Sequence, residues 1–317
     1  MRTPPDGYRK CPVDLSALAE KKIGIIGYGN QAHAWALNMF DSGLEVYIGL
    51  RVRSPHSGDA IADLIEVLTP DRAAKMCDII CMLIPDEVIP ICLRENIFPN
   101  IAEGDAIVFA HSYSLFAGDT KLPRNIDCIL LAPHGPGTAV REAYLAESGI
   151  PAQMAIVQDF TGNADAIALG LASSLGFASG GLRPTDYRQE TIIDLFSEQA
   201  VLVGGLVAII KQALEALESA GYDTASSRVS CLDEIIGTAI LFAEGGLAGG
   251  LEKVSTAAAF GALKAEELLR PPLKEVFKIL LADIESGKFA AELESASSAE
   301  SKDLEEFKKQ LRKIAGR

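Results

Sequence analysis

The sequence predicts an α/β protein in which a doubly wound parallel sheet is followed by an all-helical domain. Short apolar runs alternate with helical stretches over about 185 residues, a glycine turn follows the first of these runs, and strand signals stop near residue 187. Such alternation is typical of parallel sheets that are covered by helices on both faces. We therefore expect two domains, residues 1–185 and residues 186–317.

Composition and charge narrow the class of protein. The chain has 317 residues, of which 49% are hydrophobic and 23% charged, as expected for a soluble globular protein. A net charge of −14 argues against binding to nucleic acid and against attraction to anionic membranes. The longest apolar run, residues 200–210, is shorter than the ~20 residues of a membrane span. We expect a cytoplasmic protein with neither kind of partner.

The cysteines indicate a reducing compartment. They are scattered, several stand in apolar runs, and no secretory signal precedes them, so we expect reduced thiols in a core. Cys77 and Cys81 have a spacing that a metal cluster could use, but they flank a strand-like DII segment, which argues against zinc. The six are Cys11, Cys77, Cys81, Cys92, Cys128 and Cys231.

The first strand leads directly into a dinucleotide-binding pattern. An apolar run at 22–26 is followed by a glycine turn and an alanine-rich helix, as in the Rossmann fingerprint. Gly27 allows the tight turn, and Gly29 allows a pyrophosphate to approach the amino end of the helix, where free amides favour anions. Ala32 occupies the third position of the pattern. The expected cofactor-binding residues here are Gly27, Tyr28, Gly29, Asn30 and Gln31.

The end of the second strand favours NADP over NAD. This strand, at 44–50, is followed by Arg51, Arg53 and Ser54, where an NAD-binding chain usually offers a carboxylate to the ribose hydroxyls. Two guanidinium groups and a hydroxyl suit a 2′-phosphate instead. A solvated basic loop is the alternative reading of the same residues.

Further strands are expected at 77–85, 106–110, 128–132 and 152–157. Because ligands bind at the carboxyl ends of the strands in such sheets, three loops are candidates for the chemistry. They contain Pro85 and Asp86, His111 to Ser114, and the segment 133–137 with His134. We assign Pro85 and Asp86 to the cofactor site.

Beyond residue 187 the pattern is helical. We expect helices at 192–217, around 230–243, and at 257–269, 273–285 and 301–315, the last as a surface helix or a frayed end. The glycine pairs 204–205 and 245–246 are interpreted as sites of close helix contact rather than linkers.

Two carboxylates in the apolar stretch 190–206 predict a metal site. Asp194 and Glu198 are four residues apart, so on a helix they share one face. Carboxylates among apolar neighbours need a partner or a cation, and oxygen ligands suit a hard cation such as magnesium. The alternative is an amphipathic helix with a hydrated acidic edge.

Taken together, the motifs resemble those of short-form ketol-acid reductoisomerases over most of the chain. The matching segments are IGIIGYGNQAHAWALN, LIPDEV, FAHS, LAPHGPG, QDFTGNA, ETIIDLFSEQAVLVGG, AGYDTA, AEGGL and VSTAAAFG. The resemblance implies an NADPH-binding Rossmann domain and a knotted, all-helical C-terminal domain that forms a homodimer with shared active sites. It also implies two magnesium ions, a small carboxylic acid substrate and a role in branched-chain amino acid biosynthesis.

The resemblance assigns roles to five residues. Asp194 matches the aspartate that bridges both magnesium ions, and Glu198 matches the glutamate that completes the first metal site. His111 matches the histidine of an FAHG-type loop, here FAHS. Glu234 matches a glutamate from the partner subunit that bonds to the substrate, and Ser255 matches a serine that holds the substrate carboxylate.

Two positions depart from the family pattern. The family has a lysine in an APKGPG-type loop where this chain has His134, and it has a second metal-ligand glutamate where this chain has Ser230. Asp233 is a poor substitute on a regular helix, since successive residues point about 100° apart. One magnesium ion is therefore expected, and the second site is expected to be empty.

These losses bear on the reaction, because alkyl migration needs more charge stabilisation than hydride transfer does. We expect an NADPH-dependent reductase that acts on a small 2-oxo or imino acid, with the isomerase half-reaction weakened or lost. In it, His134 or His111 would donate the proton. The alternatives are an authentic ketol-acid reductoisomerase, in which protonated His134 replaces the lysine, and a catalytically inactive cofactor-binding homologue.

Overall fold

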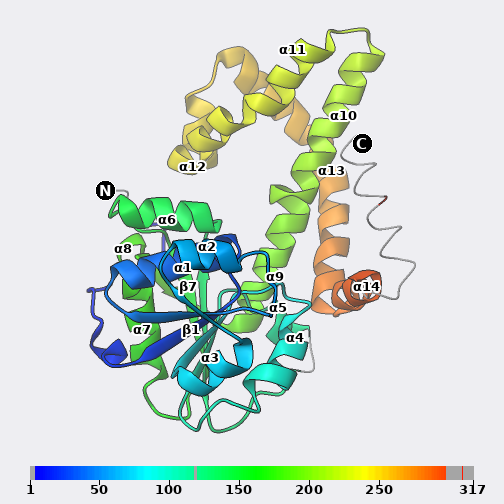
Figure 1. Ribbon diagram of the computed structural model, residues 1–317. Coiled ribbons are helices and arrows are strands. Elements are labelled where there is room, and N and C mark those ends of the chain that lie inside the picture. Colours follow the sequence, from blue (N-terminus) through cyan, green and yellow to red (C-terminus); the bar gives the residue numbers. More distant parts are fainter. Residues whose placement is uncertain (1–3, 118–119, 298–308, 310–317) are drawn as a thin grey trace. The chain divides into compact units, whose positions relative to one another are not determined.

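The computed structural model describes residues 4–117, 120–297 and 309 (Figure 1). The chain forms two compact units, one of residues 1–191 with 294–317 and the other of residues 192–293. The division falls inside helix α9 (Tyr187–Ser197). The domain boundary at 185/186 stays a prediction, as does the helix at 301–315, which lies outside the described residues except for Lys309.

The first unit is built on one eight-stranded sheet with the strand order β3-β2-β1-β4-β5-β6-β7-β8. All strand pairs are parallel except β6 with β7. The strands are β1 (Lys22–Ile26), β2 (Glu45–Gly49), β3 (Glu66–Leu68), β4 (Ile79–Met82), β5 (Ala106–Phe109), β6 (Asp127–Pro133), β7 (Ala152–Gln158) and β8 (Leu182–Pro184). Every expected strand is present, and the sequence pattern missed β3 and β8, which have only three residues each.

The edge pair β7 and β8 runs against the rest of the sheet. Pro133 pairs with Ala152 across β6 and β7, while Ala152 pairs with Leu182 across β7 and β8. The expectation that the strand at 152–157 continues a parallel sheet was therefore wrong in direction. As a result, β7 and β8 begin at the end of the sheet where β1 to β6 have their carboxyl ends.

Helices cover both faces of the sheet, which produces two hydrophobic clusters. One contains Ile23 and Trp35, and the other contains Ile80 and Phe109. Neighbouring strand residues point to opposite faces, so β1 to β7 each contribute to both clusters, while β8 contributes Leu182 to the first. The covering helices are α1 (Asn30–Asp41), α2 (Ser57–Ala62), α3 (Pro70–Met76), α4 (Ile89–Cys92), α5 (Tyr113–Phe116), α6 (Gly137–Leu145), α7 (Ala164–Ser174) and α8 (Phe177–Gly180), after a short 3₁₀ turn η1 (Ser16–Leu18) (Figure 1).

The second unit is made of long helices. They are α10 (Gly204–Ser219), α11 (Thr224–Arg228), α12 (Ile235–Glu252) and α13 (Thr256–Glu285), and α14 (Lys288–Ser297) follows them. The two helices expected at 257–269 and 273–285 are one helix that contains Pro271 and Pro272. Proline removes a backbone donor without always ending a helix, so the expected break was wrong. Gly246 has a non-helical backbone (φ +64°), which marks a kink in α12 rather than a helix contact.

Three π turns interrupt the helices. They are η2 (Leu93–Ile97), η3 (Glu198–Leu202) and η4 (Val229–Asp233). Each is closed by a bond that spans five residues, from Phe98 to Leu93, from Val203 to Glu198 and from Glu234 to Val229. Such turns often occur at functional sites, and η3 and η4 lie in segments that the sequence assigns to metal or substrate.

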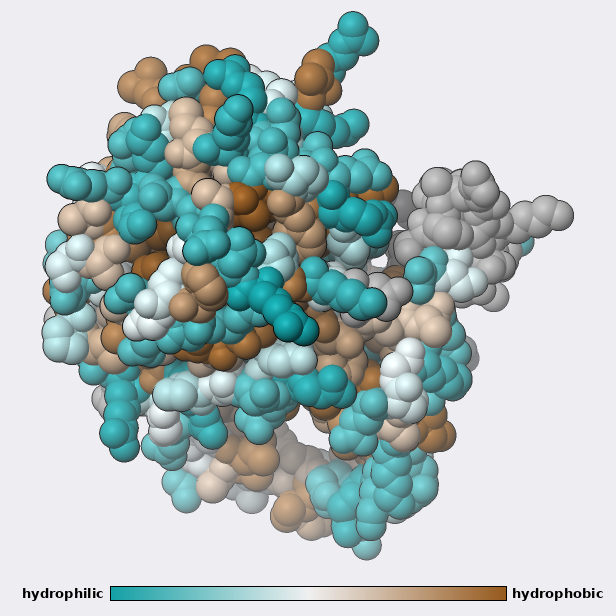
Figure 2. All heavy atoms as spheres, turned by 90° about the horizontal axis from the view of Figure 1, so that it is seen from below, coloured by the Kyte–Doolittle hydropathy of each residue, from teal (hydrophilic) through white to brown (hydrophobic). Residues whose placement is uncertain are grey.

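The second unit exposes much apolar surface. Its buried hydrophobic side chains, among the described residues, are Leu195, Ala200 and Ile284, whereas Leu247 is 79% and Ile236 is 70% exposed. The stretches Tyr187–Ser219 and Thr224–Glu252 are long and apolar enough to cross a membrane. The expectation that no segment approaches that length was therefore wrong by this measure. In the view of Figure 2, by contrast, hydrophilic side chains cover much of the surface, with hydrophobic ones interspersed.

Candidate active site

The glycine turn after β1 has the geometry that the sequence pattern requires. Gly27 has φ +107°, and a Cβ there would stand 2.4 Å from the carbonyl oxygen of Leu83 on the neighbouring β4 segment. Only glycine fits that position. At Gly29, which precedes α1, an added Cβ would meet no protein atom within 4 Å. The open space beside Gly29, at a helix amino end, suits a bound phosphate group.

A cavity of about 690 Å³ opens beside this turn. It is lined by Gly27, Tyr28, Gly29, Arg51, Ser54 and Pro85, all of which the sequence assigned to cofactor binding. The four other assigned residues, Asn30, Gln31, Arg53 and Asp86, are not part of its lining. Arg51 and Ser54 place a cation and a hydroxyl at the end of β2, so the donor set fits the 2′-phosphate of NADP.

A small network holds the turn in place. The Tyr28 hydroxyl donates to Oδ2 of Asp63 at 2.7 Å, and the His33 ring nitrogen Nε2 lies 3.2 Å from the same oxygen. Burial raises the pKa of Tyr28 well above its usual value, and the hydrogen bond to Asp63 acts in the same direction. Tyr28 therefore stays protonated as a donor, which connects the glycine turn to the end of α2.

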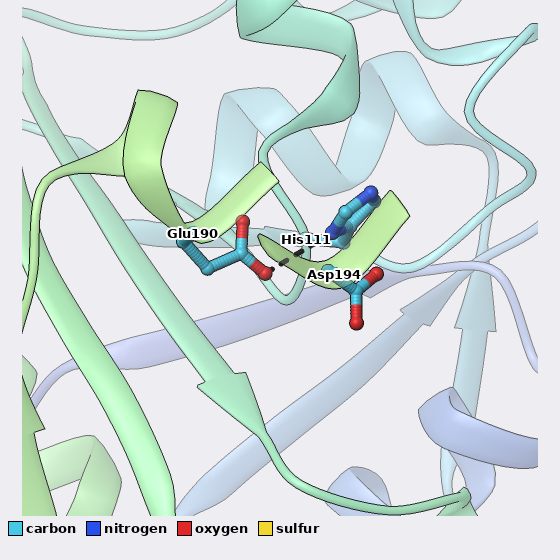
Figure 3. A group of neighbouring side chains, drawn as sticks. All are labelled: His111, Glu190 and Asp194. Carbon is cyan, nitrogen blue, oxygen red and sulfur yellow. Dashed lines mark hydrogen bonds and ion pairs between the residues drawn. The ribbon is translucent and has the colours of Figure 1, made fainter. Parts of the chain in front are cut away.

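At the end of β5, His111 and Ser112 face Glu190 on α9. His111 Nδ1 lies 3.1 Å from Glu190 Oε1, and the Ser112 hydroxyl donates to Glu190 Oε2 at 2.5 Å. Glu190 is 5% exposed, so these partners offset the cost of burying its carboxylate. Figure 3 shows the imidazole and the carboxylate pointing toward one another, with Asp194 beside them.

Asp194 joins this group because it lies one turn after Glu190 on the continuous helix α9. One ligand atom from each of His111, Glu190 and Asp194 lies within 4.8 Å of the others. Glu198, the other expected metal ligand, is exposed at the start of the π turn η3 and is not a member of this group. The carboxylates of Glu190 and Asp194 fit a hard cation such as magnesium.

His134 follows β6 and contacts the N-terminal segment. Its Nε2 lies 2.5 Å from the Tyr8 hydroxyl oxygen and 3.4 Å from the side-chain amide nitrogen of Gln153. His134 as a residue is exposed, but partial desolvation of its ring lowers its pKa, and the Glu190 carboxylate opposes this effect. A lowered pKa favours the neutral form of the imidazole.

The remaining predicted residues belong to the second unit. Ser230 and Glu234 are exposed; Ser230 lies within the π turn η4, and Glu234 follows it directly. The argument against Asp233 assumed a regular α-helix, so it does not hold in this wider turn. Ser255 is the N-cap of α13, and its hydroxyl oxygen accepts a bond from the Ala258 amide at 3.2 Å.

Three residues of the site were missed by the sequence analysis, and Ser112 was included only as part of a candidate loop. Glu190 carried a signal, since it begins the apolar stretch that contains Asp194. Tyr8 and Gln153 had none: Tyr8 lies 126 residues from its partner, and Gln153 begins a strand whose direction is reversed.

This fold and site define an NADP-dependent oxidoreductase with a Rossmann domain and a helical C-terminal domain. The family model described as "Acetohydroxy acid isomeroreductase, NADPH-binding domain" matches residues 17–181, and "Ketol-acid reductoisomerase, C-terminal domain" matches residues 187–315. The chain therefore belongs to the ketol-acid reductoisomerase family, whose members use NADPH and magnesium.

Individual relatives agree with this assignment. The ketol-acid reductoisomerase (NADP(+)) of Petrotoga mobilis is 39% identical over 87% of this chain and 84% of its own length. That of Methanocaldococcus jannaschii is 38% identical over 88% of this chain and 85% of its own length. A solved structure of an NADH-preferring ketol-acid reductoisomerase from an uncultured archean has a TM-score of 0.90 at 33% identity, covering 95% of this chain and 92% of that one.

Proposed function

We propose that this protein is an NADPH-dependent reductase of a small 2-oxo or imino acid, in which the alkyl migration of its family is weakened or lost. The observation that carries the proposal is the state of His134. At the position of the family's lysine stands an imidazole whose Nε2 contacts Tyr8 and Gln153 and whose pKa is lowered by partial desolvation of the ring. A neutral ring cannot supply the positive charge that an ammonium group offers to a developing oxyanion.

Ser230 supports the same proposal. A serine hydroxyl is a weaker ligand for a hard cation than a carboxylate, so the loss of the glutamate removes one charge from the second metal site. We propose that Asp194 and Glu198 hold one magnesium ion, with Glu190 as a neighbouring carboxylate. When bound, NADPH supplies the hydride and magnesium an electrophile.

The protein's own residues would then hold the substrate and move one proton. In this proposal Arg51 and Ser54 bind the cofactor phosphate, while His134 or His111 gives a proton to the reduced atom. Glu190 fixes His111 through the 3.1 Å contact. Glu234 and Ser255 are proposed to reach the substrate from the partner subunit, by resemblance to the family.

A homodimer is part of the proposal. The exposed apolar side chains of α10 and α12 need a covering, and a second copy of this chain, rather than a bilayer, is the covering that a cytoplasmic enzyme would use. The knotted arrangement of the helices and the cytoplasmic location are proposed on the same resemblance. Sedimentation equilibrium without detergent would test this, since a monodisperse monomer at micromolar concentration would contradict it.

The decisive experiment compares substrates. NADPH oxidation is followed with 2-acetolactate, with simple 2-oxo acids and with imino acids, each with and without magnesium. We expect kcat/KM for at least one 2-oxo or imino acid to exceed that for 2-acetolactate by about 10-fold or more, which corresponds to ~1.4 kcal/mol in transition-state binding. Efficient turnover of 2-acetolactate would contradict the proposal.

A gain-of-function variant sharpens this test. His134→Lys combined with Ser230→Glu restores the two groups that the family pattern expects, so we expect it to raise turnover of 2-acetolactate. His134→Lys with Ser226→Glu is the matched control, because Ser226 is an exposed serine on the neighbouring helix α11. Equal rates in the two double variants would mean that Ser230 is not a lost ligand.

An authentic ketol-acid reductoisomerase is the second candidate, and the names of relatives at 38–39% identity favour it. Complementation of an isoleucine–valine auxotroph separates the two, since only this candidate restores growth. An inactive homologue would show no thermal shift with either NADPH or magnesium, whereas a specific ligand stabilises the folded state by mass action.

A further inference from the structure

The N-terminal segment places a phenol against the one histidine that replaces the family's lysine. Tyr8 Oη lies 2.5 Å from His134 Nε2, and the two rings meet edge to face with centroids 5.5 Å apart. The next residue is fixed to the sheet, because Arg9 and Leu182 exchange backbone bonds of 2.9 and 2.8 Å. The backbone that follows Tyr8 is therefore held against β8.

The partners of Nε2 define the tautomer of His134. A side-chain amide nitrogen only donates, and that of Gln153 lies 3.4 Å from Nε2. If Nε2 accepts from Gln153, the Tyr8 hydroxyl must donate to it as well. The neutral ring then carries its proton on Nδ1, a tautomer assigned from the hydrogen-bond partners.

The His134 loop also packs directly on the cofactor turn. A Cβ at Gly137 would stand 2.1 Å from the carbonyl oxygen of Asn30 and 2.8 Å from the Cα of Gln31. Glycine is thus required where the loop after β6 meets the amino end of α1. This close approach places the loop that carries His134 next to the amino end of α1, while His134 itself is not part of the cavity lining.

We propose that Tyr8 and His134 form a proton relay for the reduction, with Tyr8 as the positioning residue that fixes and recharges the imidazole. The inference rests on the proposed function. As the substrate carbon accepts the hydride and its electron pair from NADPH, the π pair of the carbonyl moves to oxygen. That oxygen takes the proton from Nδ1, Nε2 takes the proton of the Tyr8 hydroxyl, and water returns a proton to the phenolate.

A cation helps to fix the position of the phenol ring. The Arg183 guanidinium carbon lies 5.9 Å from the centroid of the Tyr8 ring. A guanidinium at this range attracts the electron-rich ring. Arg183 is on β8, one of the two reversed strands, and Gln153 is on the other.

The test uses Tyr8→Phe, which removes the hydroxyl and keeps the ring. Tyr47→Phe is the matched control, because its hydroxyl also makes a 2.5 Å bond, to Glu45, outside the site. General acid–base catalysis contributes roughly 10²- to 10⁴-fold, so we expect Tyr8→Phe to lower kcat about 10-fold or more. KM and the affinity for NADPH should stay within twofold, and the acidic limb of the pH profile of kcat should move.

A second readout needs no turnover. Long-range ¹⁵N–¹H spectra of the parent should show Nε2 of His134 as an unprotonated acceptor, and Tyr8→Phe should convert the ring to a mixture of tautomers. A protonated Nε2 in the neutral parent ring, or a kcat within twofold of the parent in Tyr8→Phe, would overturn the relay. If the parent reduces no 2-oxo or imino acid, the proposed function fails, while the spectra still decide whether Tyr8 fixes the tautomer.

Discussion

The N-terminal unit buries its apolar residues within itself, and the C-terminal unit does not. Trp35, Phe109 and Phe177 are fully buried in the first unit, where helices cover both faces of the sheet. In the second unit Ile236 and Leu247 are mostly exposed. The first unit thus has a hydrophobic core of its own, whereas the second would bury comparable area only against the partner surface that we propose.

Truncation of a core side chain should have the largest effect. Phe109→Ala removes a fully buried ring, and we expect the free energy of unfolding of the first unit to fall by about 3–5 kcal/mol. Trp35 is the single tryptophan and lies in the same unit, so its fluorescence during urea unfolding reports this change. Phe160→Ala, at a 46% exposed position, is the control. If the decrease in the free energy of unfolding depended on protein concentration, the first unit would not be stable independently of association, and the difference between the two units would be contradicted.

The second-largest effect is expected from a charged side chain introduced into the exposed apolar surface of the second unit, which should weaken association. Ile236→Asp is expected to weaken the dimer by on the order of 2 kcal/mol or more, about 30-fold in dissociation constant, because it buries an unpaired carboxylate in the interface. The urea concentration at the midpoint of unfolding, as reported by Trp35 fluorescence, should not change. Sedimentation equilibrium measures the association, and Leu64→Asp, at an 84% exposed position of the first unit, is the matched control. Equal behaviour of the two variants would contradict the proposed interface.

A smaller effect is expected at the glycine turn. Tyr28→Phe removes the 2.7 Å bond to Asp63, which should cost about 1 kcal/mol of stability in the first unit. Because Tyr28 also lines the cavity, the affinity for NADPH should fall by a few fold. Urea unfolding and cofactor fluorescence titration check the two parts. An altered dimer affinity would show that the units are less independent than proposed.

The smallest effect concerns pH. Partial desolvation of its ring lowers the pKa of His134 below its usual value of 6.5, so the unfolded chain binds more protons than the folded chain as the pH falls below 6.5. Stability therefore decreases on acidification through this range. His134→Gln should lose stability less steeply between pH 7 and pH 5 than the parent, as followed by Trp35 fluorescence. An identical slope would mean that this ring is not withdrawn from water.

Sequence reasoning succeeded where local pattern and local structure coincide. The glycine turn, the long strands and the Arg51 and Ser54 positions all follow from residues close together in the chain. It failed where pairing between distant segments decides, as in the reversal of β7 and the contact of Tyr8 with His134. It also failed for Glu190, because burial of a carboxylate depends on the partners His111 and Ser112, which the chain supplies from another strand.

The π turns η3 and η4 have a consequence for insertions and deletions. Each turn holds one residue more than an α-helical turn does, and the wide turn at η3 is followed by Gly204 and Gly205, where a Cβ would stand 2.3 and 2.0 Å from carbonyl oxygens. Deletion of one residue from Glu198–Leu202 would let an ordinary α-helix run through. It would rotate all of α10 by about 100° relative to Asp194. The extra residue in η3 therefore sets the rotation of α10 about its own axis. That rotation determines which face of α10 is aligned with the acidic residues that precede it.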